Sequence, residues 1–306
     1  MLFRSSPANS AAVRLDLLPG AKWRYAGGGY CVVQQLVLDV TGETFSEFMR
    51  SRVLGPAGMD ASTYEQPLPA ALAPLAATGH RADGTRVPGD AHIYPELAAA
   101  GLWTTAGDLA RFALAVQHAL EGHNGLLTPE TAKQILQTPV AGSDYGLGFG
   151  VKGSGVKLQL SHGGSNIGFR CMLVVYPFAG RGAVIMTNAD NGSVFAEEIL
   201  RAIAHEYDWP DYRVAEKTAV PLAPEAFADF VGRYEREDTP LLVFRDRGHF
   251  NVRVGSRPRT EIFPQSDHEF FTLDAPEIWS FERDARGEVT HAILRASPPQ
   301  LYRRVR

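Results

Sequence analysis

The sequence predicts an α+β protein in which helices pack on an antiparallel β-sheet, followed by a small antiparallel β-barrel. Three observations support this fold class. Apolar residues recur at helical spacing over residues 30–40 and 109–120. Apolar runs separated by turn signals cover residues 156–187. After residue 224 the pattern changes to short strands that alternate with turns, which is typical of a small barrel or sandwich.

The composition excludes several classes of protein. The chain has 306 residues, of which 45% are hydrophobic and 21% charged, as in an ordinary globular protein. The net charge of −4 gives no electrostatic argument for nucleic acid or an anionic membrane as a partner. No apolar run approaches the roughly 20 residues that span a bilayer. Residues 1–6 show no signal-peptide core, so a cytoplasmic location is the default expectation, and the oligomeric state stays open.

Cysteine and histidine usage gives no sign of a metal or cofactor. Cys31 falls on a predicted helix and Cys171 on a predicted strand, so two buried free thiols are expected, with a structural disulfide as the alternative. No group of histidines and cysteines has the spacing of zinc ligands. We therefore expect no metal and no cofactor.

The first half of the chain carries clear signals for helix ends. A glycine-rich corner at residues 26–29 opens a helix that Gly42 ends. Thr44 and Glu47 form a capping box for a second helix. A long loop is expected over residues 64–98. Further helices should begin after Thr105 and after Thr128, which precedes a proline.

The next stretch predicts an antiparallel meander and one more helix. Residues 156–160 alternate between apolar and polar, and Phe169–Tyr176 and Gly182–Thr187 are further apolar runs. A helix over residues 193–207 should then cover the sheet, with four apolar side chains facing it: Phe195, Ile199, Leu200 and Ile203.

The polar, proline-bearing stretch after this helix indicates a domain boundary. We expect a first domain over residues 1–210, a linker over 211–223, and a β-barrel domain over 224–306.

Two glycine-rich corners each place a proton-handling side chain at the end of a regular element. They are Tyr25-Ala26-Gly27, before the first helix, and His162-Gly163-Gly164, at the end of the first meander strand. Taken alone, the tyrosine could be a packing residue and the histidine a surface residue. A phosphate loop at residues 27–29 is disfavoured, because the Lys-Ser/Thr pair and a preceding apolar strand are absent.

Because it contains both of these corners, the chain resembles the serine β-lactamase and penicillin-binding-protein family, in its class C-like branch. That branch includes D-Ala-D-Ala carboxypeptidases, D-aminopeptidases and esterases. Its fingerprint is Ser-x-x-Lys, then Tyr-x-Asn, then Lys- or His-Thr/Gly-Gly. The resemblance rests on YAGGGYCVVQQLVLDVTGETFSEF, GPAGM, AAAGLWTTAGDLARFA, YGLGFGV and SHGGSNIGF, and it covers residues from about 14 to 207. The last 80 or so residues are similar to the lipocalin-like barrel appended to some of these hydrolases.

The resemblance implies an acyl-enzyme reaction on an amide or ester such as a D-amino-acid peptide, a β-lactam or a carboxylic ester. Tyr25 would exchange a proton with the nucleophile and the leaving group, and His162 would stand at the cationic position of the edging strand. The backbone N–H of Ser165 would be one oxyanion donor. Further residues would contact the substrate, which is a small molecule or peptide: Gly27, Gly163, Gly164, Asn166 and Tyr145. For Asn166 and Tyr145, turn or core roles are the alternative.

Two departures from the family pattern affect the expected activity. Gly27 stands where the family has asparagine. The Ser-x-x-Lys element does not precede Tyr25, and only Ser154–Lys157 fits that pattern, which we interpret as chance. In the family the lysine lies one helical turn from the serine and assists its ionisation. We therefore expect an amino-terminally truncated and inactive family member, or alternatively a non-catalytic binding module that retains the pocket wall.

Overall fold

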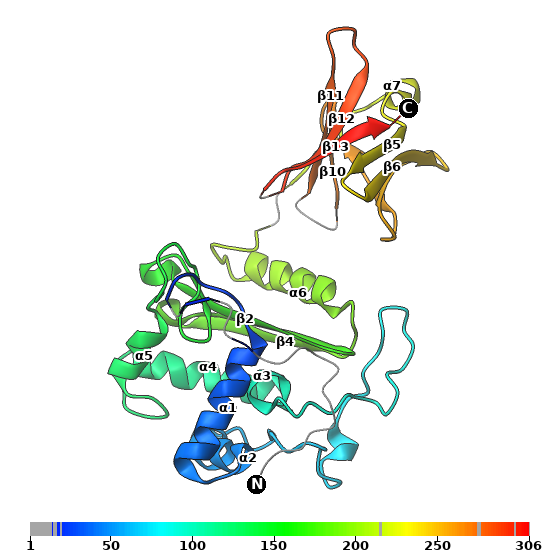
Figure 1. Ribbon diagram of the computed structural model, residues 1–306. Helices are drawn as coiled ribbons and strands as arrows, with labels where there is room; N and C mark the ends of the chain where they lie inside the picture. Colours follow the sequence, from blue (N-terminus) through cyan, green and yellow to red (C-terminus); the bar gives the residue numbers. More distant parts are fainter. Residues whose placement is uncertain are drawn as a thin grey trace. The chain divides into compact units, whose positions relative to one another are not determined.

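The computed structural model describes residue 14 and residues 17–18, 20–213, 216–273, 277–296 and 298–305. The chain forms two compact units, residues 1–213 and 214–306. The first unit combines helices with a four-stranded sheet, and the second contains a nine-stranded sheet (Figure 1). The predicted α+β class is confirmed.

The helices of the first unit begin at the capping residues that the sequence signals. Thr44 and Glu47 form the expected capping box, and Thr105 and Thr128 each accept a hydrogen bond from the first turn of their helices. The helices are α1 (Gly27–Thr41), α2 (Phe45–Met49), α3 (Leu97–Ala100), α4 (Ala106–Leu120), α5 (Pro129–Ile135) and α6 (Gly192–Glu206). Single turns are η1 (Arg50–Leu54), η2 (Ala73–Leu75), η3 (Gly155–Lys157) and η4 (Pro177–Ala179).

The sheet of the first unit is an antiparallel meander in the order β1-β2-β3-β4. Its strands are β1 (Gly150–Lys152), β2 (Gln159–Asn166), β3 (Phe169–Tyr176) and β4 (Arg181–Thr187). β1 pairs with β2 only from Gln159 to Ser161, whereas β3 pairs with β2 from Leu160 to Asn166. Among the described residues, the outer edge of β2 from His162 onward therefore has no neighbouring strand.

Helices cover both faces of this sheet. Successive side chains of β3 point to opposite faces, and apolar residues of β3 are buried on both. Leu173 and Val175 face one side, where they pack in the apolar cluster that includes α4 and α5. Val174 and Tyr176 face the other side and pack against Leu200 of α6. The sheet thus lies between α6 and the layer that contains α4 (Figure 1).

Two apolar residues are not where the sequence pattern predicted them. Val156 lies in the η3 turn rather than in a strand and is 66% exposed, because left-handed backbone at Gly153 and Gly155 turns the chain there. Phe195 is 62% exposed rather than facing the sheet. α6 buries the row Ala196, Leu200 and Ala204, and Phe195 lies one residue outside it.

A polar network holds the chain after α6 against the sheet. The Tyr176 hydroxyl donates to Asp211 Oδ2 over 2.9 Å, and Lys152 Nζ donates to Asp211 Oδ1 over 2.6 Å. The buried Gln159 donates to Tyr176 Oη over 2.6 Å. Trp209 packs edge-on against the Tyr176 ring at 5.2 Å. Asp211, which begins the predicted linker, therefore belongs to the first unit.

The second unit is a nearly closed antiparallel sheet with one short helix, α7 (Pro224–Ala228). Its order is β8-β7-β6-β5-β13-β12-β11-β10-β9. The strands are β5 (Gly232–Arg236), β6 (Thr239–Asp246), β7 (His249–Val254), β8 (Thr260–Glu261), β9 (Phe263–Pro264), β10 (Glu269–Phe271), β11 (Ile278–Arg283), β12 (Val289–Leu294) and β13 (Gln300–Val305). The two end strands, β8 and β9, are separated only by Ile262, so one continuous stretch of chain closes the sheet.

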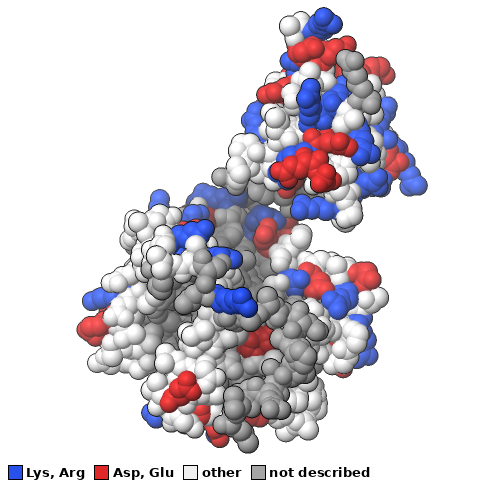
Figure 2. All heavy atoms as spheres, in the orientation of Figure 1, with Lys and Arg blue, Asp and Glu red and all other residues white. Residues whose placement is uncertain are grey.

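Large aromatic side chains fill the interior of the second unit. Phe230 and Phe270 pack edge-on at 5.5 Å, and Phe281 lies 4.6 Å from Phe230. All three are buried, as are Tyr234 and Trp279. On its visible face, positive and negative side chains are interspersed (Figure 2). A lipocalin-like relationship stays a prediction.

Candidate active site

Four rings from three separate segments form one partly exposed cluster in the first unit. The Tyr25 ring lies 6.3 Å from the His162 ring and 6.0 Å from the Tyr145 ring. The Tyr145 and His162 rings are 6.2 Å apart, and Trp23 packs on Tyr145 at 5.1 Å. The structure thus brings together the two glycine-rich corners that the sequence singled out.

Tyr25 is placed by the start of α1. The backbone leaves an extended conformation at Ala26 and enters the helix at Gly27. The Tyr25 side chain is 61% exposed, so its hydroxyl is accessible to a ligand. A side chain at Gly27 would meet no heavy atom within 4 Å, so the packing does not require glycine there.

His162 is placed by β2 and is half-buried. It is paired with Leu173 of β3 and lies on the face of the sheet that carries the α4 cluster. Burial lowers the pKa of the His162 imidazole, and a hydrogen bond with the backbone of Gly163 offsets part of that effect. The neutral ring is therefore favoured, and it offers one donor and one acceptor nitrogen.

Tyr145 is held by a tight hairpin ahead of β1. Its backbone bridges to Gly150, and Gly146 N–H donates to Phe149 O over 2.8 Å. Gly146 is required here, because a Cβ at this position would lie 2.1 Å from the carbonyl oxygen of Ile135. Burial raises the pKa of the Tyr145 hydroxyl, and the neighbouring Tyr25 adds to the effect.

The end of β2 presents alternate residues to different sides. Gly163 and Ser165 are exposed, whereas His162, Gly164 and Asn166 are half-buried. Gly164 faces Cys171 across the strand pair. The side-chain amide of Asn166 donates to Ala100 O over 2.9 Å, which is a structural contact.

The single Ser-x-x-Lys sequence lies in an exposed turn. Ser154 precedes η3, a single turn of 3-10 helix that contains Lys157. Both residues are exposed. This is a different setting from a buried helix that presents serine and lysine side by side.

The two cysteines are each half-buried, whereas the sequence predicted buried thiols. Cys31 and Cys171 are both free thiols, and burial raises the pKa of the Cys171 thiol, which disfavours the thiolate. Over the described part of the chain, no group of three or more His, Cys, Asp or Glu residues could hold a metal ion. No described helix is long and apolar enough to cross a membrane.

Sequence reasoning did not single out Trp23, Tyr94, Arg170 or Asp190. Trp23 could have been found, because it stands two residues before Tyr25 and alternation places both on one side of an extended segment. Tyr94 and Asp190 come from distant parts of the chain and meet Arg170 of β3 at the turn after β2. No local pattern signals such a meeting.

The sequence of the first unit matches the model of a known protein family. The family model described as Beta-lactamase matches residues 5–208, so the chain belongs to the β-lactamase family of serine hydrolases.

Two curated relatives indicate the range of this family. The chain is 22% identical over 280 residues to penicillin-binding protein 4* of Bacillus subtilis, covering 83% of this chain and 60% of that protein. It is 26% identical over 252 residues to a D-aminopeptidase of Brucella anthropi, covering 78% of this chain and 44% of that protein. The chain therefore spans about half of the length of these relatives.

Solved structures share the fold. The structure of SurE has a TM-score of 0.52 at 23% identity, covering 94% of this chain and 70% of that chain. The octameric penicillin-binding protein homologue from Pyrococcus abyssi has a TM-score of 0.52 at 18% identity, and the match covers 93% of this chain and 66% of that chain. At these identities the likeness concerns the fold alone.

Proposed function

We propose that the surface around Tyr25 and His162 is the proton-transfer and oxyanion side of an acyl-transfer site for amides or esters. The observation that carries this proposal is the 6.3 Å separation of the two rings beside the open edge of β2. The substrate would be a D-amino-acid peptide, a β-lactam or a carboxylic ester, as the family resemblance implies, and two relatives are named as a penicillin-binding protein and a D-aminopeptidase.

Each residue would have a separate task. The exposed Tyr25 hydroxyl would take a proton from the attacking hydroxyl and return it to the leaving group. His162, favoured in its neutral form, would hydrogen-bond with that phenol or with the substrate rather than act as a fixed cation. The N–H of Ser165 would stabilise the oxyanion of the tetrahedral intermediate.

The open edge of β2 suits an extended substrate. Beyond Ser161 no described strand pairs with this edge, so a peptide could add to it as a further strand. The exposed Gly163 would let the substrate backbone approach closely. Gly27 has no side-chain amide to hold a substrate carbonyl, which favours substrates bound mainly through their backbone.

The reaction also needs an activated hydroxyl, and the 306 residues carry Ser-x-x-Lys only at Ser154. The exposed η3 turn does not place a lysine beside that serine in a buried helix. We therefore propose that the 306-residue chain by itself forms no acyl-enzyme. The second candidate function, which this observation favours, is a non-catalytic module that binds the same peptides.

The test uses a fluorophosphonate and a penicillin, with intact-protein mass spectrometry. The 306-residue chain should stay unlabelled, and so should its Ser154→Ala variant. A longer version with a Ser-x-x-Lys helix ahead of Tyr25 should be acylated, and Tyr25→Phe should slow that acylation by roughly 10²-fold or more. Labelling of the short chain at Ser154 would contradict the proposal.

The binding-module candidate is tested separately. If it holds, the 306-residue chain binds a D-Ala-D-Ala peptide in calorimetry without hydrolysing it, and the longer version is not acylated. Acylation of the longer version would rule it out.

A further inference from the structure

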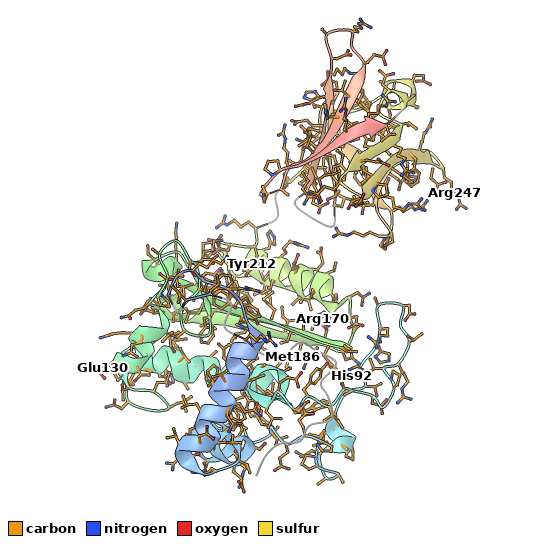
Figure 3. All side chains as sticks on the ribbon, in the orientation of Figure 1. His92, Glu130, Arg170, Met186, Tyr212 and Arg247 are labelled. Atoms are coloured by element: carbon orange, nitrogen blue, oxygen red, sulfur yellow. The ribbon has the colours of Figure 1, made fainter. Side chains whose placement is uncertain are left out.

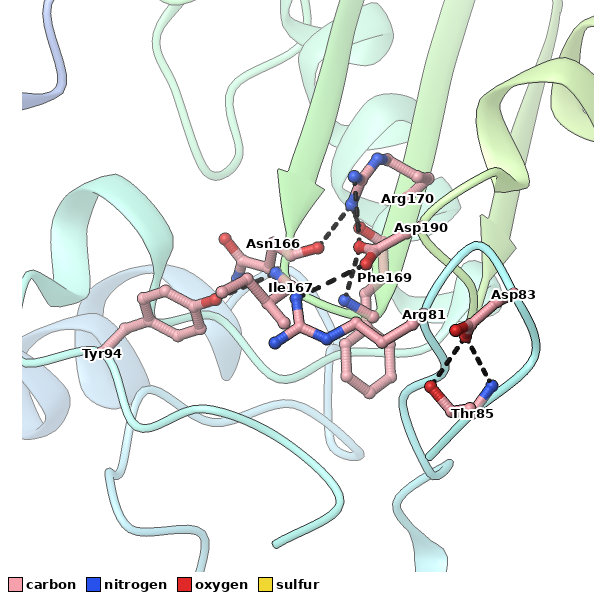
Figure 4. A network of polar contacts seen from close by, with 10 residues as sticks. Arg81, Asp83, Thr85, Tyr94, Asn166, Ile167, Phe169, Arg170 and Asp190 are labelled. Atoms are coloured by element: carbon pink, nitrogen blue, oxygen red, sulfur yellow. Dashed lines mark hydrogen bonds and ion pairs between the residues drawn. The ribbon is translucent and has the colours of Figure 1, made fainter. Parts of the chain in front are cut away.

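Three distant segments hold the turn between β2 and β3 (Figure 4). The N–H of Ile167 donates to Tyr94 Oη over 3.0 Å, and the N–H of Gly168 donates to Asp190 Oδ1 over 2.8 Å. The turn lies directly after Asn166, whose amide donates to Ala100 O. Its backbone donors are thus bound by side chains from outside the sheet.

Asp190 also reaches the strands on both sides of this turn, through Arg170 of β3. Arg170 Nη2 lies 3.2 Å from Asp190 Oδ1, and Arg170 Nη1 donates to Asn166 O, the last residue of β2, over 2.5 Å. Both charged side chains are about four-fifths buried. Figure 3 shows Arg170 at the end of the sheet, and Figure 4 shows its contacts.

The carboxylate of Asp190 is itself held in place. Its backbone N–H donates to His80 O over 2.9 Å, and Arg81 Nη1 lies 3.6 Å from Asp190 Oδ2. The hydrogen bond from Gly168 lowers the pKa of the Asp190 carboxyl, and the two arginines lower it further. The group is therefore ionised near neutral pH and holds its partners by charge-assisted contacts.

Backbone packing adds a second constraint on the turn. Gly168 has φ +80°, and a Cβ there would lie 2.8 Å from the Cα of Gly79. The loop that contains Arg81 therefore lies directly against the turn. A movement of that loop or of Asp190 would move the end of β2.

From this geometry we propose that Asp190 is a positioning residue for the end of β2, and thereby for the N–H of Ser165. The catalytic part of the inference rests on the proposed function, in which that N–H is an oxyanion donor. Such donors act over a narrow range of distance, and a displacement of about 1 Å can cost roughly 10²-fold in rate.

The first experiment needs no catalytic activity. Hydrogen exchange of the 306-residue chain, followed by mass spectrometry of its peptides, compares Asp190→Ala, Asp190→Asn and the control Asp83→Asn. Asp83 lies in the loop that contains Arg81, and its carboxylate accepts hydrogen bonds from Thr85 (Figure 4). Asp190→Ala should speed exchange over residues 163–170 by roughly tenfold, with a smaller effect for Asp190→Asn, which keeps an acceptor for Gly168.

The same experiment separates positioning from general stability. Exchange over residues 182–187 of β4 should stay unchanged in all three variants. Unchanged exchange over 163–170 in Asp190→Ala would overturn the proposal. Equal acceleration of every sheet segment would also overturn it, because Asp190 would then act only on the stability of the whole unit.

The second experiment concerns catalysis and uses the longer version with Ser-x-x-Lys. Asp190→Ala should lower its acylation rate by roughly 10- to 100-fold while the final labelled fraction stays the same. An unchanged rate would contradict the catalytic part. If the longer version is not acylated at all, the proposed function fails, and the exchange measurement still decides whether Asp190 positions β2.

Discussion

The ring of His162, on β2, lies 6.3 Å from the ring of Tyr25, just ahead of α1, although the two residues are far apart in the sequence. Each is placed by a different element, and Tyr145 contacts both rings from a third.

The free energy of unfolding of the chain should decrease as the pH is lowered, because of His162. Its folded pKa lies below the unfolded value of about 6.5, so below that pH the unfolded state takes up the proton more readily. The contribution of His162 is therefore present above pH 6.5 and is lost as the pH falls through the folded pKa. Urea unfolding should show a larger loss of stability from pH 7.5 to 5 in the native chain than in His162→Gln.

The control for this measurement is His123→Gln, which changes an exposed histidine. It should keep the pH dependence of the native chain. An identical pH dependence in His162→Gln and the native chain would contradict the assignment of a lowered pKa.

Gly164→Ala should destabilise the first unit. A Cβ at Gly164 would lie 2.4 Å from Cys171 Sγ on the paired strand, and overpacking of this kind costs about 1–3 kcal/mol. Cys171→Ala removes the sulfur, so the double variant should recover most of the loss. Urea unfolding of the two single variants and the double variant measures this coupling.

The matched control is Gly27→Ala, where the new methyl group meets nothing within 4 Å. It should leave stability unchanged or raise it, because alanine is the better helix former. Additive effects of Gly164→Ala and Cys171→Ala would show that the two residues do not clash.

The surface of α1 should promote self-association. No residue of this helix is buried, and Val32, Leu36 and Val40 are each more than half exposed. Exposed apolar patches of this kind favour association. Val32→Glu combined with Val40→Lys should lower the binding of a hydrophobic dye and the average mass in light scattering, and change stability by less than about 0.5 kcal/mol.

Val116→Glu on α4 is the comparison, since α4 has the same length as α1 but buries Val116. This variant should lose several kcal/mol of stability, because a buried carboxylate lacks a partner. Unchanged self-association in the α1 double variant would contradict the prediction.

The second unit should fold alone as a β protein. Its aromatic core is drawn entirely from residues after 220. A fragment of residues 214–306 should give a β-type circular dichroism spectrum and a single cooperative unfolding transition. Phe230→Ala should destabilise it by about 3–5 kcal/mol, because this ring is fully buried. A helical spectrum, or no cooperative transition, would contradict the prediction.

Local sequence signals determined the positions of the helices and of the main strands. Capping at Thr44, Thr105 and Thr128 depends on residues within one helical turn, so it is visible in the sequence. Where local rules misled, a tertiary effect was responsible. Phe195 fits an apolar stripe, but the small residues Ala196 and Ala204 allow α6 to approach the sheet on a different face.

The sequence by itself also determined the family and the two glycine-rich corners, because each motif consists of residues that are neighbours in the chain. Only the tertiary structure decided how those corners meet. The contact of Tyr25 with His162 depends on where α1 lies relative to β2, and the bonds of Asp190 join β3, the turn that precedes it and a distant loop. Burial of His162, which favours its neutral form, likewise depends on neighbours supplied by packing. No pattern of nearby residues encodes such contacts, because they arise when distant segments fold against one another.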